Sequence, residues 1–94
     1  MRFEWNAQKA AANLRKHGVS FVEAATVFLD PFSATAEDPD HSADEARFLI
    51  FGTSSMGRLL AVGPAECGDS IRIITAREVT RSERKLYEES QEGR

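Results

Sequence analysis

Two arginines in the second half of the chain, Arg72 and Arg77, are the side chains best suited to bind an anion. A guanidinium group binds phosphate through two parallel hydrogen bonds. Arg77 follows a β-branched segment and precedes a charged helix, so it is expected at the end of a strand, where small domains often place binding groups. Residues 72–85 carry five basic and two acidic side chains, although the whole chain has a net charge of −3. This local excess predicts a surface that meets nucleic acid or an acidic partner.

A histidine, His17, supplies the side-chain type that moves protons near neutral pH. Internal cleavage of RNA needs a base for the 2′-hydroxyl, an acid for the leaving oxygen, and cations for the charge on phosphorus. We therefore expect catalysis by Arg77, Arg72 and His17. The candidates for positioning RNA are Lys9, Arg58 and Arg81.

Each of these candidates also has a purely structural interpretation. His17 stands at the expected end of a helix, where the helix dipole favours a histidine. Arg72 and Arg77 are also placed to form surface ion pairs with Glu78 or Glu83, as exposed charges commonly do. Lys9 and its basic helix neighbours Arg15 and Lys16 are typical of a solvated face, from which one of them could contact phosphate.

No metal or cofactor is expected. His17 and His41 are far apart and lack the spacing of zinc ligands. The acidic loop at residues 37–45 lacks the glycine and terminal glutamate of a calcium-binding loop. Cys67 is the only cysteine, so it has no partner for a disulfide or a thiolate site. There is no glycine-rich phosphate loop, and the overall acidity excludes a general, non-specific nucleic-acid binder.

The hydrophobic pattern predicts one domain over residues 1–94 of the α+β class. Two N-terminal helices precede a four-stranded antiparallel meander, and a C-terminal helix follows it. Asn6 is expected to cap the first helix and Gly18 to end it, with Asn13 on the same face as Ala10 and Leu14. Residues 20–23 and 80–83, which end in Glu23 and Glu83, have the form of capping boxes, and Leu86 is expected to be the main apolar contact of the last helix. The expected elements are a short strand or extended arm at 2–5, helices at 7–17 and 21–29, strands at 32–36, 47–53, 58–62 and 70–76, and a helix at 80–90. Pro64 is expected to end the third strand. No apolar run is long enough to cross a membrane, and the first residues are not a signal sequence, so a cytoplasmic protein is expected.

Strict alternation along residues 70–76 would place Arg72 on the opposite face of the sheet from Ile71 and Ile73. The same alternation would place Ile74 and Ala76 on the Arg72 face. If the helices cover Ile71 and Ile73, Arg72 points to the open face.

Two stretches closely resemble the signatures of the BrnT toxin family. The first comprises residues 3–6, Lys9 and residues 13–24, and the second comprises residues 69–77 with Thr80, Glu83 and Arg84. The resemblance implies a RelE-like α+β fold and a ribonuclease toxin of a type II toxin–antitoxin pair that arrests translation. It also implies a BrnA-like ribbon-helix-helix antitoxin, which would provide the contact with operator DNA.

The chain departs from the family pattern at three places. Asn6 stands where the family usually has aspartate, and Ser70 stands where arginine is common. Residues 64–67 replace a His-Thr-Glu-Arg run at the end of the third strand. The resemblance therefore leaves two alternatives, an active and metal-independent endoribonuclease, or a weakened or inactive homologue that binds the antitoxin and regulates the operon.

Overall fold

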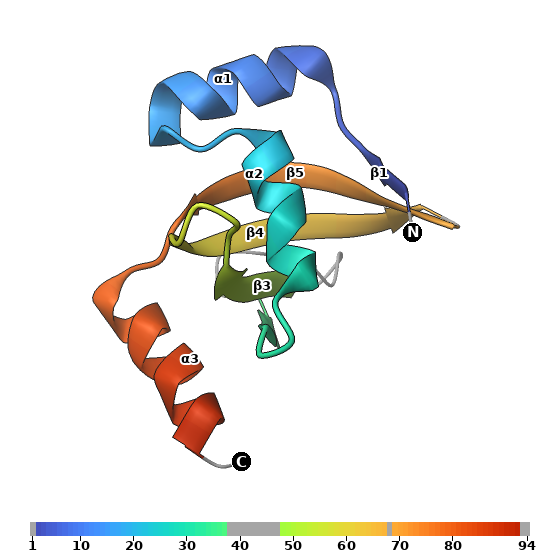
Figure 1. The fold of residues 1–94 in the computed structure, drawn as a ribbon. Helices are drawn as coiled ribbons and strands as arrows, with labels where there is room; N and C mark the ends of the chain where they lie inside the picture. The colour runs from blue at the N-terminus through green and yellow to red at the C-terminus, as the bar shows by residue number, and fades with distance from the viewer. Residues whose placement is uncertain (1, 38–47, 68, 93–94) are drawn as a thin grey trace.

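The computed structural model describes residues 2–37, 48–67 and 69–92 (Figure 1). This part of the chain forms a five-stranded sheet with the strand order β1-β5-β4-β3-β2. The elements are β1 (Arg2–Glu4), α1 (Ala7–His17), α2 (Phe21–Thr26), η1 (Val27–Leu29), β2 (Ala34–Glu37), β3 (Phe48–Thr53), β4 (Leu59–Cys67), β5 (Ser70–Glu78) and α3 (Arg81–Glu92). The α+β class agrees with the prediction, whereas the four-stranded sheet does not. The predicted acidic loop lies, from residue 38 onward, outside the described residues.

The additional strand is β1, which pairs in parallel with β5. Its three residues, Arg2–Glu4, lie opposite Ser70, Ile71 and Arg72. The sequence predicted an extended segment here, but three alternating residues are too few to indicate a partner nearly seventy positions away. The other four strands form the predicted antiparallel meander.

Strand β4 continues through Pro64 to Cys67, so the predicted strand end at Val62 is wrong. The β4–β5 register shifts at this point, because Gly63 lies opposite Thr75 while Pro64 lies opposite Ile73. Ile74 is therefore the extra residue of a β-bulge, and a bulge is one place where a sheet accepts proline. Gly63 is needed here, since a Cβ atom at this position would lie 2.7 Å from Cγ2 of Thr75.

The bulge reverses the alternation of side chains along β5. Ile73 and Ala76 are both buried against the N-terminal helices, with exposures of 1% and 0%. The prediction that Ala76 shares the face of Arg72 is therefore wrong. Since Arg72 precedes Ile73 and Arg77 follows Ala76, both arginines belong to the opposite face of the sheet.

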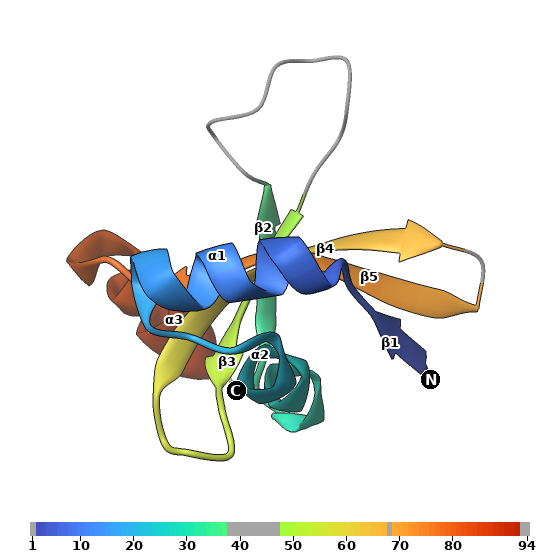
Figure 2. The same ribbon diagram turned by 90° about the horizontal axis from the view of Figure 1, so that it is seen from above.

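Helices cover both faces of the sheet. Alternate residues on β4 separate the two cores, because Leu60 and Val62 pack with α2 residues while Ala61 packs with Leu49 and Phe51 on the other side. Figure 1 shows α2 against one face of the sheet and α3 on the other side, and Figures 1 and 2 show α1 running roughly along β5. None of the described helices is long and apolar enough to span a bilayer.

The predicted caps of α1 and α3 are local features that the structure confirms, whereas the helix predicted at 21–29 is α2 followed by the short 3-10 helix η1. The Asn6 side chain accepts a hydrogen bond from Lys9 N at 3.0 Å, and α1 ends at Gly18, whose φ of 71° is left-handed. At the start of α3, the Thr80 hydroxyl accepts from Glu83 N, and Thr80 N donates to the Glu83 carboxylate at 2.9 Å. This reciprocal pair is the predicted capping box.

The packing of α3 differs from the prediction. Leu86, expected to be its main apolar contact, is 55% exposed. Tyr87 packs instead against the smaller core, and its hydroxyl donates a hydrogen bond of 2.8 Å to Asp30. Because α3 is strongly polar, its one aliphatic residue was not enough to predict which side of the helix is buried.

Candidate nucleic-acid interface

An open pocket of about 220 Å³ lies between α1 and β5. Lys9, Lys16 and His17 line it from α1, and the bulge residues Ile74 and Thr75 line it from β5, with Ala12 and Asn13 between. The α1 residues share one side of the helix because the others lie three, four, seven and eight positions after Lys9. The fold thus brings together two predicted site residues, Lys9 and His17.

Asn13 fixes the position of α1 against β5. Its side-chain nitrogen donates hydrogen bonds to Ala76 O at 2.8 Å and to Val19 O at 2.9 Å, and its oxygen accepts one from Ala76 N at 3.2 Å. Strand β1 pairs with β5 only as far as Arg72. Past Arg72, the Asn13 amide therefore forms the backbone hydrogen bonds at Ala76 that a neighbouring strand would otherwise form with β5. Sequence reasoning placed Asn13 on a helix face and missed this role.

The basic side chains of α1 are not neutralised by the fold. The helix contains Lys9, Arg15, Lys16 and His17 and no carboxylate. None of the four forms an ion pair with any residue that the structure describes. His17 also ends the helix, as its structural interpretation predicts. The pocket therefore carries positive charge that is available to an external anion.

Arg77, unlike the basic residues of α1, forms an ion pair with Glu83 of α3. Its Nη1 and Nη2 atoms donate hydrogen bonds of 2.6 and 2.8 Å to the two carboxylate oxygens. These bonds lower the pKa of Glu83 to about 2, against the opposing effect of partial burial. The ion pair foreseen as the structural alternative is thus formed, and a phosphate group would have to displace Glu83 to reach Arg77.

The Arg77–Glu83 ion pair is expected to make a pH-dependent contribution to stability. Glu83 has a folded pKa of about 2 against an ordinary value of 4.5. Its contribution is therefore complete above the unfolded pKa and is lost as the pH falls through the folded one. Between pH 6 and pH 2, we expect the wild type to lose about 1–2 kcal/mol more unfolding free energy than Glu83→Gln. Urea unfolding over this pH range measures the difference, and parallel pH profiles for the two proteins would contradict it.

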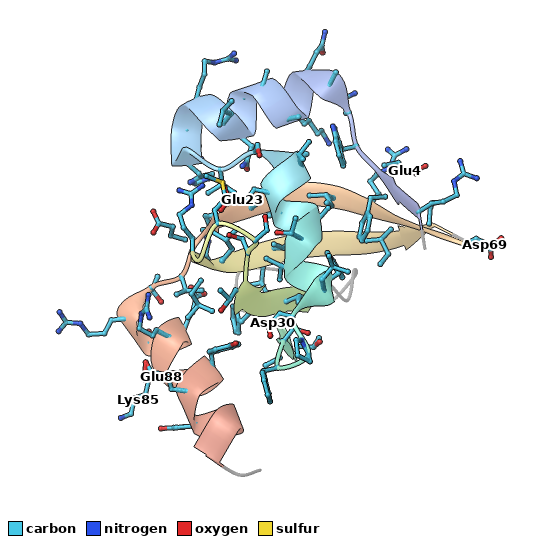
Figure 3. The ribbon with its side chains drawn as sticks, in the orientation of Figure 1. Glu4, Glu23, Asp30, Asp69, Lys85 and Glu88 are labelled. Carbon is cyan, nitrogen blue, oxygen red and sulfur yellow. The ribbon has the colours of Figure 1, made fainter. Side chains whose placement is uncertain are left out.

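Arg72 lies opposite Glu4 in the β1–β5 pairing, and Figure 3 labels Glu4. The Arg72 Nε atom is 3.4 Å from Glu4 Oε1, and the two side chains are 53% and 40% exposed. The predicted partners of this arginine were Glu78 or Glu83, so its pairing with Glu4 differs from the prediction. An exposed pair of this length contributes little to stability.

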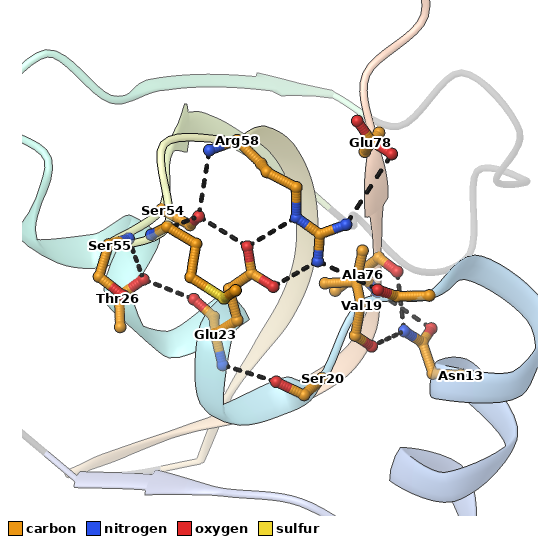
Figure 4. A network of polar contacts seen from close by, with 12 residues as sticks. Asn13, Val19, Ser20, Glu23, Thr26, Ser54, Ser55, Arg58, Ala76 and Glu78 are labelled. Carbon is orange, nitrogen blue, oxygen red and sulfur yellow. Dashed lines mark hydrogen bonds and ion pairs between the residues drawn. The ribbon is translucent and has the colours of Figure 1, made fainter.

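Arg58 is a structural residue at the centre of a polar network (Figure 4). Its guanidinium forms two hydrogen bonds with the Glu23 carboxylate, one of them from Nε at 2.9 Å, and donates another to Gly18 O at 3.0 Å. The Ser54 hydroxyl donates to the same carboxylate at 2.7 Å. Glu23 is 5% exposed, and its pKa is lowered chiefly by Arg58. The predicted RNA contact at Arg58 would therefore require breaking a buried ion pair.

The candidate residues divide between the two sides of the sheet. Lys9 and His17 lie at the α1 pocket, whereas Arg72 and Arg77 extend from the opposite face. Arg81 begins α3 and is exposed. The structure thus does not assemble His17, Arg72 and Arg77 into one centre. Arg72 lies on the face opposite the buried Ile73, and the bulge at Ile74 places Arg77 on the same face as Arg72, away from α1.

Comparisons with known proteins agree with this fold. A family model described as the ribonuclease toxin BrnT of type II toxin–antitoxin systems matches residues 5–83. The crystal structure of the Brucella abortus ribonuclease toxin BrnT superposes with a TM-score of 0.62 at 21% identity, over 86% of this chain and 99% of that one. A comparison with curated protein sequences gave no match. A type II toxin has an antitoxin as its partner. The match over most of its length shows that the chain belongs to the BrnT family of ribonuclease toxins.

Proposed function

We propose that this protein is a metal-independent endoribonuclease that inhibits translation in the cytoplasm and is neutralised by a BrnA-like ribbon-helix-helix antitoxin. DNA is reached only through that antitoxin. The observation that carries the proposal is the α1–β5 pocket, which places His17 beside lysines that have no carboxylate partner among the described residues. Membership of a family of ribonuclease toxins supports RNA as the substrate.

The proposed chemistry needs only the RNA, these side chains and water. His17 accepts the proton of a 2′-hydroxyl, whose oxygen forms a bond to the adjacent phosphorus. The bond from phosphorus to the 5′ oxygen breaks, and that oxygen takes a proton from solvent in the open pocket. Lys9 stabilises the charge that develops on the phosphate oxygens. The products are a 2′,3′-cyclic phosphate and a free 5′-hydroxyl.

Arg72 and Arg77 provide an alternative site on the opposite face of the sheet. There they would stabilise phosphate charge after RNA displaces Glu4 and Glu83 from them. Arg81, which is exposed at the start of α3, would position RNA at this second site. We favour the α1 pocket because its cations require no such displacement.

A catalytically weakened, antitoxin-binding homologue is the second candidate function. The observation that favours it is the engagement of Arg58, Arg72 and Arg77 with carboxylates of the chain itself. A protein of this kind would retain the partner surface and contribute to operon autoregulation. It would bind its antitoxin without cleaving RNA.

Incubation of end-labelled RNA with the purified protein in EDTA separates the two functions. The ribonuclease proposal predicts cleavage that survives the chelator and yields cyclic-phosphate ends. Absence of cleavage at several salt concentrations, together with tight antitoxin binding, would establish the binding module instead. In cells, induction is expected to arrest growth, and coexpression of the antitoxin is expected to relieve the arrest.

A further inference from the structure

We infer that the α1–β5 pocket is a phosphate subsite in which Lys9, Lys16 and His17 hold a backbone phosphodiester of single-stranded RNA. The identity of the polymer rests on the proposed function. The phosphate subsite itself is a binding property and does not depend on whether the bound strand is cleaved. It assigns a ligand contact to Lys16 and places the bulge residues Ile74 and Thr75 against the strand.

The charge distribution supports an anionic ligand. Three of the four basic side chains of α1 face the pocket, and Arg15 is the exception. No carboxylate lines the pocket. In a chain with a net charge of −3, Arg58, Arg72 and Arg77 are each paired with a carboxylate of the chain itself. Helix α3 mixes three basic with four acidic residues. Helix α1, in contrast, presents basic side chains with no carboxylate among them.

The shape of the pocket favours a nucleotide over an acidic peptide. Lys9 and Lys16 are seven residues apart, about 10 Å or two turns along the helix axis, and both line the pocket. Between them lie the small Ala12 side chain and, across the pocket, the half-buried Ile74. Apolar surface between two cations suits a chain in which phosphates alternate with sugars and bases.

The pocket is held in shape by contacts that leave its cations available. Both polar atoms of the Asn13 side chain are used in hydrogen bonds to the backbone of Val19 and Ala76. The Thr75 hydroxyl lies 3.5 Å from Asn13 Oδ1, too long for a strong hydrogen bond, so it can turn toward a phosphate oxygen. Preorganised walls of this kind lower the cost of binding a flexible strand.

A titration with a short 2′-O-methyl oligoribonucleotide tests the subsite without cleavage, because this RNA has no 2′-hydroxyl to react. We expect amide chemical-shift changes at residues 9–17 and 74–75. Lys16→Gln should weaken binding by about ten-fold at low salt and reduce the slope of log affinity against log salt by about 0.7, the value for one phosphate contact on a single strand. Arg15→Gln is the matched control, since it removes the same charge from the neighbouring position outside the pocket.

Three results would overturn the inference. Equal weakening by Lys16→Gln and Arg15→Gln would show a general effect of helix charge. Shift changes confined to the Arg72 and Arg77 face would place the strand on the other side of the sheet. Equally tight binding of an oligoglutamate of the same charge would show that the pocket takes carboxylates rather than phosphates.

The same titration distinguishes this inference from the proposed function. Binding of the methylated RNA at α1 by a protein that does not cleave ordinary RNA would refute the ribonuclease proposal and keep the subsite. Cleavage of ordinary RNA by a protein whose α1 signals do not respond to the methylated strand would refute the subsite and keep the ribonuclease.

Discussion

Replacement of Arg58 by methionine is expected to lower the free energy of unfolding by about 3 kcal/mol. The substitution would leave the Glu23 carboxylate, which is 5% exposed, with the Ser54 hydroxyl as its remaining side-chain partner. An unpaired charge in such a position is strongly destabilising. Urea unfolding at neutral pH, followed by circular dichroism, measures the change.

The matched control is Arg72→Met, which removes an arginine from an exposed pair. Because Arg72 and Glu4 are 53% and 40% exposed, this change should cost less than about 0.5 kcal/mol. The double variant Glu23→Met with Arg58→Met should recover part of the loss, since no buried charge then remains. Equal costs for Arg58→Met and Arg72→Met would show that the network in Figure 4 is not a stabilising one.

Replacement of His17 by glutamine is expected to reduce the rate of RNA cleavage by about 100-fold or more. Glutamine keeps a polar amide at the end of α1 but cannot exchange a proton near neutral pH. Gly18 and the Asn13 contacts that position this end of the helix are unchanged. Single-turnover rates at saturating RNA measure the chemical step apart from binding.

Arg72→Gln is the control for this second prediction, since it removes a charge from the exposed Glu4 pair on the opposite face. We expect the cleavage rate of this variant to stay within about two-fold of the wild-type rate, because Arg72 lies outside the α1 pocket. A large loss with Arg72→Gln and none with His17→Gln would assign the chemistry to the open face of the sheet.

The elements that sequence reasoning predicted well are those fixed by neighbouring residues. Asn6 and Gly18 begin and end α1, and Thr80 with Glu83 caps α3, as their positions in the sequence indicate. The β1–β5 pairing and the β-bulge at Ile74 were not predictable in this way. They depend on contacts between distant segments, which local patterns do not record.

The site was predicted by residue type but not by arrangement. The Arg77–Glu83 pair lies within six residues and was foreseen as an alternative. The partner of Arg58 lies 35 positions away, and Glu23 had been assigned to a helix cap. The single extra residue in β5 then decides which side of the sheet Arg77 faces, so one unrecognised bulge placed Arg77 on the face of Arg72 and away from His17.

The most direct test of the account is photocrosslinking of a 2′-O-methyl RNA that carries 4-thiouridine, with the attached residue identified by mass spectrometry. We predict crosslinks within residues 9–17 of α1 and at the adjacent bulge residues 74 and 75. Crosslinks confined to the face that carries Arg72 and Arg77, or to α3, would contradict the assignment of the RNA site to α1.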